Sequence, residues 1–262
     1  MFVDAHCHLT GDEYQSLGGA DGVIARAKAN GVGIIVASGF DLESSMLSAQ
    51  IAHRHDGVYF SAGFHPSEIG KMKGGDLTKL KRLCTDEKCV AVGEIGLDYH
   101  FDDNPPKEKQ KQAFLDQLFI ADELGLPVVV HSRDACADTL ELLQANATLL
   151  KKGGLMHCYS YSAESVRDFS ALGFSFSFGG TATFKNAKKV QESVKTVARD
   201  RLLSETDCPY LSPEPLRGRF PNLPENVAHV TKRLAQLREE EWESVQKTIL
   251  ANVKRLFFKI GE

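Results

Sequence analysis

The chain has 262 residues, of which 42% are hydrophobic and 25% are charged, as is typical of a soluble globular protein. Its net charge of −4, from 31 basic and 35 acidic residues, excludes a protein that coats long stretches of nucleic acid with a broad basic surface. No apolar run approaches the roughly 20 residues that span a bilayer, so we expect no membrane contact and a cytoplasmic protein.

Short apolar runs alternate with amphipathic stretches along the chain. Helical periodicity is clear at 107–124, and a further helix is predicted at 239–258. Apolar runs that continue through a strand indicate burial on both faces, and therefore a parallel sheet covered by helices. The predicted strands are 2–6, 33–38, 58–65, 89–96, 127–132, 154–158, 174–178 and 201–206.

This alternation predicts an α/β fold, a (β/α)8 TIM barrel with an extra C-terminal helix. Eight strand and helix units over about 250 residues are what such a barrel requires. A doubly wound open sheet is the alternative, but no Gly-x-Gly-x-x-Gly motif follows the first strand. No linker, charge block or low-complexity stretch divides the chain, so we expect a single domain over 1–262.

The first strand ends in an unusual pair of histidines, in the sequence MFVDAHCHLT. Residues two apart on a strand face the same side, so His6 and His8 project together and Cys7 points away. Two neutral imidazoles on one face make half of a divalent-metal site. Taken alone, the pair is equally consistent with two partly buried histidines bonded to backbone carbonyls.

Further polar residues occur at the ends of later strands, which is where barrels of this kind place their chemistry. Four histidines together with two carboxylates suit hydrolytic chemistry with Zn²⁺, Mn²⁺ or Mg²⁺. A carboxylate on a central strand can bridge two metals, which gives Glu94 a role. In chain order, the strand-end residues after His6 and His8 are His65, Glu94, His131, His157, Glu205 and Asp207.

The motifs that carry these residues resemble those of the TatD-related metal-dependent DNases, a family of amidohydrolase-like TIM barrels. The resemblance runs from residue 2 to about 215. The matching segments, in order, are DAHCHL, GFHP, VGEIGLDYH, PVVVHSRDA, MHCYS and ETDCPYLSP.

This resemblance implies two divalent metal ions per chain, with Zn, Mn and Mg as the choices. It also places His65 and Glu205 near the bound phosphate and water. One metal would be held by His6, His8, Glu94 and Asp207, and the other by Glu94, His131 and His157.

The resemblance further implies a deoxyribonuclease that cleaves phosphodiester bonds from DNA ends, as a 3′–5′ exonuclease with a metal-activated water as nucleophile. Asp207 would orient or deprotonate this water, and Glu94 would serve both metals. We expect DNA ends or another small phosphodiester as the partner, and no obligatory protein partner. The expected substrate contacts are His65, Arg133, Glu205 and Arg219.

Two alternatives remain open at this stage. The same site could hydrolyse amides or esters, for example as an aminoacyl-tRNA deacylase, because a fold does not fix its substrate. A non-enzymatic scaffold is disfavoured by the full ligand set. The segments 159–161 and 219–225 depart from the family pattern and flank the mouth of the site, so they leave the choice of substrate open.

Overall fold

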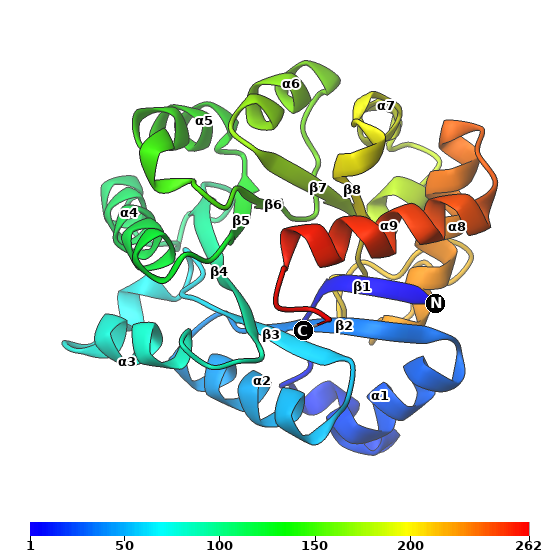
Figure 1. The fold of residues 1–262 in the computed structure, drawn as a ribbon, viewed down its shortest axis with the longest axis horizontal. Helices are drawn as coiled ribbons and strands as arrows, with labels where there is room; N and C mark the ends of the chain where they lie inside the picture. Colours follow the sequence, from blue (N-terminus) through cyan, green and yellow to red (C-terminus); the bar gives the residue numbers. More distant parts are fainter. Residues whose placement is uncertain (262) are drawn as a thin grey trace.

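The computed structural model describes residues 1–261, and over these residues eight parallel strands form one sheet in the order β1 to β8. The sheet curls into a nearly closed barrel with helices around it (Figure 1). This confirms the predicted TIM barrel. The strands are β1 Phe2–Cys7, β2 Val32–Ser38, β3 Val58–Ala62, β4 Cys89–Asp98, β5 Val128–Arg133, β6 Gly154–Met156, β7 Phe174–Phe178 and β8 Leu202–Ser204.

Helices separate successive strands and cover the outside of the barrel, and a final helix, α9, follows the helix that comes after β8 (Figure 1). The predicted extra C-terminal helix is therefore confirmed. The helices are α1 Gly19–Ala29, α2 Leu42–Arg54, α3 Asp76–Leu83, α4 Lys107–Leu124, α5 Cys136–Ala145, α6 Ala163–Ala171, α7 Lys188–Thr196, α8 Val227–Arg238 and α9 Trp242–Leu256.

The strands are buried because side chains fill the barrel on one face and contact helices on the other. All ten residues of β4 are buried, and apart from Glu94 and Asp98 they are apolar or glycine. Helix α9 buries Val245, Ile249 and Val253, which are spaced four apart and so share one face. Burying each such side chain stabilises the fold by about 1.5–3 kcal/mol.

Side-chain hydrogen bonds, together with backbone hydrogen bonds just beyond β8, connect the first and last strands across the seam of the barrel. Within residues 1–261 the backbone ladder runs from β1 to β8 without joining these two ends. Instead, both carboxylate oxygens of Asp4 accept hydrogen bonds from Thr206, from its backbone N–H at 2.8 Å and its hydroxyl at 2.6 Å. Just beyond, the N–H of Asp207 donates to the carbonyl of His6 at 3.0 Å. The seam therefore fixes the positions of His6 and Asp207 relative to each other.

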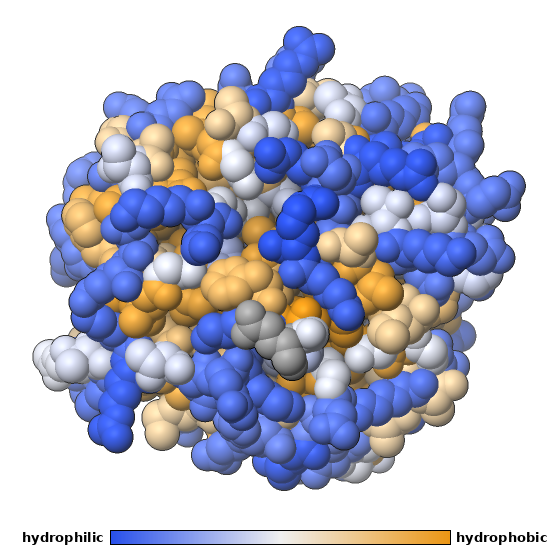
Figure 2. Space-filling view, in the orientation of Figure 1, coloured by the Kyte–Doolittle hydropathy of each residue, from blue (hydrophilic) through white to orange (hydrophobic). Residues whose placement is uncertain are grey.

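The chain after α9 turns back across the end of the barrel where the strands begin. Lys259 donates to the carbonyl of Asp86, just before β4, and Phe257 is fully buried. Figure 2 shows hydrophobic residues around the middle of this face and hydrophilic residues around them. Within residues 1–261, no helix combines the length and the apolar character that crossing a membrane requires.

Candidate metal centre

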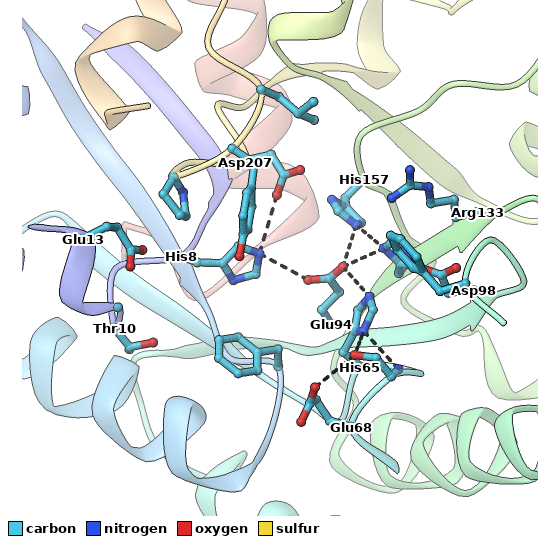
Figure 3. Close-up of a pocket in the computed structure, with 18 residues that line it drawn as sticks. His8, Thr10, Glu13, His65, Glu68, Glu94, Asp98, Arg133, His157 and Asp207 are labelled. Carbon is cyan, nitrogen blue, oxygen red and sulfur yellow. Dashed lines mark hydrogen bonds and ion pairs between the residues drawn. The ribbon is translucent and has the colours of Figure 1, made fainter. Parts of the chain in front are cut away.

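A pocket of about 710 Å³ lies at the C-terminal ends of the strands. His8, Glu94, His131, His157 and Asp207 all line it. In Figure 3, Glu94 is central, with His8 on one side and His65 and His157 on the other.

The first group consists of His6, His8, Glu94 and Asp207. The Nε2 atom of His6 lies 3.4 Å from Glu94 Oε2 and 3.7 Å from Asp207 Oδ1, and the Nε2 atom of His8 lies 3.5 Å from each. Ligands about 2.0–2.2 Å from a tetrahedral metal are about 3.3–3.6 Å apart. Three of the four distances lie in this range and the fourth is 3.7 Å, so the four side chains come close to the spacing of a tetrahedral site.

The second group surrounds the other oxygen of the same carboxylate. Glu94 Oε1 lies 2.8 Å from His131 Nδ1 and 2.8 Å from His157 Nε2, and these two nitrogens are 3.2 Å apart. Neighbouring ligands of an octahedral metal, each about 2.0–2.1 Å away, are about 2.8–3.0 Å apart. The two pairs that include Glu94 have this spacing and the two nitrogens are slightly further apart, and Glu94 is the residue that the two groups share.

Hydrogen bonds behind the histidines hold their ligating nitrogens toward the pocket. His8 Nδ1 donates to the carbonyl of Ser38 at 2.9 Å, so this nitrogen keeps its proton and Nε2 is the atom that faces the proposed metal position. His131 Nε2 pairs with Asp98 Oδ2 at 3.2 Å, which likewise leaves Nδ1 facing Glu94. His6 Nε2 is buried with no hydrogen-bond partner among the described residues, as expected of an atom that awaits a metal.

The site presents ionised carboxylates to a cation. Burial alone would raise the pKa of Glu94, but the charge of His157 and the hydrogen bonds from His131 and His157 outweigh it and hold this pKa well below its usual range. Burial would also lower the pKa of His8, yet its hydrogen bond to Asp207 and the charge of Glu94 raise it to about 9. His8 therefore pairs with these carboxylates as an opposite charge when no metal is bound, whereas burial and the charge of His157 lower the pKa of His6 to about 4 and leave it neutral at pH 7.

Local backbone conformation allows these side chains to converge. Gly96 lies between Glu94 and Asp98 on the same face of β4, with φ of 144°. A Cβ atom there would lie 1.9 Å from the carbonyl oxygen of His131, so only glycine lets the two strands approach this closely. Asp207 has φ of 54°, a left-handed conformation that aspartate tolerates better than most residues.

Two of the four predicted substrate residues, His65 and Arg133, line the pocket. His65 lines the pocket, and its Nδ1 accepts the N–H of Ser67 at 3.2 Å, which leaves the proton on Nε2, 3.6 Å from Glu94 Oε1. Arg133 also lines the pocket, on the side away from Glu13 (Figure 3).

Two of the predicted substrate residues do not line the pocket. Glu205 is fully buried, 3.8 Å behind His157 Nδ1, because its carboxylate accepts hydrogen bonds from the N–H of Cys158 and the hydroxyl of Ser177. It therefore lies behind a histidine as a buried carboxylate and does not face substrate. Arg219 is exposed and outside the pocket wall.

The sequence reasoning overlooked Ser38 and Asp98, although both carried a signal. Asp98 lies four residues after Glu94 on one strand, and strand alternation places both on the same face. Ser38 is the last residue of β2, a strand end for which no site residue was proposed.

An α/β barrel that brings four histidines and two carboxylates together at the ends of its strands defines the class of metal-dependent hydrolases. The family model of TatD related DNases matches residues 3–258, and the chain belongs to this family.

Similar proteins and a similar crystal structure support membership of this family. The chain is 42% identical over 257 residues to YabD of Bacillus subtilis, an uncharacterized metal-dependent hydrolase, covering 98% of this chain and 99% of that protein. It is 35% identical over 243 residues to the 3′-5′ ssDNA/RNA exonuclease TatD of Cronobacter sakazakii, covering 91% and 92%. The crystal structure of the TatD homologue YJJV from Escherichia coli has a TM-score of 0.91 at 31% identity and covers 98% of each chain.

Proposed function

We propose that this hydrolase is a 3′–5′ exonuclease that removes nucleotides from the ends of single-stranded or frayed DNA, using two divalent metal ions. The observation that carries the proposal is that Glu94 directs one carboxylate oxygen to each of two histidine groups. The polarity and the nucleic-acid substrate follow the name of the exonuclease relative from Cronobacter sakazakii.

The two proposed metal positions share Glu94 and otherwise use different ligands. When bound, the two cations would supply Lewis-acid activation of a water and of the phosphodiester. Zn²⁺, Mn²⁺ and Mg²⁺ all suit these nitrogen and oxygen donors. One position would be formed by His6, His8, Glu94 and Asp207, and the other by Glu94, His131 and His157.

Three side chains of the pocket would act on the attacking water and on the phosphate. Asp207 faces the histidines through Oδ1, so Oδ2 would accept the proton of the water that attacks phosphorus as the bond to the leaving oxygen breaks. Arg133 would bind a non-bridging phosphate oxygen. His65 would donate from Nε2 to the same phosphate, because its Nδ1 is already an acceptor.

The charge of the pocket supports action at a strand end. Among the described residues that line it, Arg133 is the only lysine or arginine, and Glu13 and Glu68 are also part of the wall. With Glu94, Asp98 and Asp207, five carboxylates line the pocket beside this one cation, which suits contact with few phosphates, whereas the middle of a duplex would present many.

The test uses the metal-loaded protein with defined oligonucleotides. With Mn²⁺ or Mg²⁺ we expect a single strand to shorten stepwise from its 3′ end, a blunt duplex to shorten more slowly, and EDTA to stop both. A matched panel of amides and esters tests the other hydrolytic class. Turnover of that panel without any shortening of DNA would contradict the proposal.

A further inference from the structure

Two large aromatic side chains at the pocket mouth have no part in the chemistry described above. Phe101 is 51% exposed and Tyr210 is 58% exposed, and both line the pocket beside Leu211, which is 36% exposed. Single exposed apolar residues are common, but several that share the wall of one pocket mark a binding surface.

The two rings approach the pocket from opposite sides of the barrel. Phe101 follows β4 and Tyr210 follows β8, and the strand order places these strands four apart in a sheet of eight. In a barrel that is nearly closed, strands four apart face each other across the axis. A flat group that enters the pocket would therefore meet an aromatic surface on either side.

The charge around the rings points to the kind of group that enters. The guanidinium of Arg133 lies 5.0 Å from the centre of the Phe101 ring, close enough for a cation–π interaction that steadies the ring at the mouth. The same cation is available to one phosphate. Aromatic surfaces beside a single cation suit an unpaired nucleobase joined to one phosphate, because the faces of paired bases are already stacked.

Resting on the proposed nuclease function, we propose that Phe101 and Tyr210 form a clamp for unpaired nucleobases. The clamp holds bases next to the phosphate that lies at the metal centre. It selects a single-stranded or frayed end by stacking, and it is indifferent to base identity because every base offers a flat face.

The test measures binding apart from cleavage. A single strand that carries 2-aminopurine near its 3′ end, with phosphorothioate linkages to slow turnover, is titrated with the metal-loaded full chain. Stacking quenches 2-aminopurine fluorescence. Phe101→Ala and Tyr210→Ala should each raise the Kd by about 5- to 150-fold, which corresponds to about 1–3 kcal/mol per base. Phe101→Tyr and Tyr210→Phe should bind like the wild type.

A matched control and a matched substrate separate stacking from general damage. Phe119→Ala removes a side chain that is 52% exposed on α4 and is not part of the pocket wall, so it should not change the Kd. A strand with abasic residues at its 3′ end should bind weakly and equally to the wild type and to both clamp variants.

The outcomes distinguish the clamp from the nuclease. Equal binding of base-bearing and abasic ends by the wild type, or clamp variants that match Phe119→Ala, would overturn the clamp. A wild type that quenches the probe but does not shorten an unmodified strand would contradict the proposed nuclease and leave the clamp supported.

Discussion

Asp207 combines two tasks within one carboxylate. Its Oδ1 atom lies 3.7 Å and 3.5 Å from the Nε2 atoms of His6 and His8, and the proposed reaction uses Oδ2 as the proton acceptor. Asp207→Asn keeps the shape of the side chain and removes its negative charge and its basicity. We expect hydrolysis of a single strand to fall by at least about 10²-fold, the typical contribution of a general base.

Circular dichroism should show an unchanged fold in this variant, because Asp207 lies beyond the end of β8 and not in the core. A turnover number equal to that of the wild type would refute both tasks.

Metal binding should release protons from the histidines of the site. Without metal, Glu94 outweighs the effect of burial and raises the pKa of His157 to about 10, and the pKa of His8 is about 9. Both are therefore protonated at pH 7.5, and a metal must displace these protons. Metal affinity should rise with pH up to about 10, where His157 also loses its proton, and fall as the pH is lowered.

Titration calorimetry with Zn²⁺ at pH 7.5, in two buffers of different ionisation enthalpy, measures the proton release. We expect the heats to differ by the release of at least one proton per chain. Identical heats in both buffers would contradict the charge pairing described for the metal-free site.

Among single residues, the sequence revealed those whose chemistry stands out at a strand end. It could not place Glu205, because only the fold shows that Cys158 and Ser177 engage its carboxylate behind His157. Asp98 was harder to recognise, because its partner His131 lies on another strand, far along the chain.

At the scale of elements, the seam between β1 and β8 connects stability to the site. Asp4→Ala leaves the buried N–H of Thr206 without its partner, and an unsatisfied buried donor costs about 1–3 kcal/mol. Because Thr206 is next to Asp207, we expect weaker metal binding as well as a melting temperature several degrees lower.

Thermal unfolding with and without metal checks this prediction, with Asp56→Ala as the control. Asp56 is exposed in the turn before β3, at the opposite end of the barrel. If Asp4→Ala melts and binds metal like Asp56→Ala, the seam does not position the site.

All eight strands were predictable because their apolar runs are separated by helical periodicity. Their ends were less predictable. The third, sixth and eighth strands were expected to reach 65, 158 and 206, but β3, β6 and β8 end at Ala62, Met156 and Ser204. The residues beyond carry His65, His157 and Asp207, which turn into the pocket instead of continuing the backbone ladder. The pattern of apolar residues does not show where a strand stops pairing with its neighbours.

At the scale of the whole molecule, charge limits how much nucleic acid the protein can hold. The net charge is −4, and the pocket wall combines Arg133 with Glu13 and Glu68. Each phosphate neutralised on a single strand adds about −0.7 to the slope of log affinity against log salt. We expect a slope of about −1 to −3, for a few phosphate contacts.

Fluorescence anisotropy of a labelled single strand over a range of salt concentrations gives this slope. A slope near −10, as for a large groove-binding protein, would mean that other basic residues combine into an extended groove. Rapid nicking of a closed circular duplex would lead to the same conclusion.

The central claim is that one carboxylate, that of Glu94, joins two metal positions into a single hydrolytic centre. The most direct test follows single-strand cleavage while metal-free protein takes up Mn²⁺, with bound metal measured by equilibrium dialysis. We predict that the wild type reaches full activity at two bound ions per chain, and that Glu94→Ala stays folded, binds fewer ions and is inactive. Full activity in Glu94→Ala with two ions bound would contradict the account.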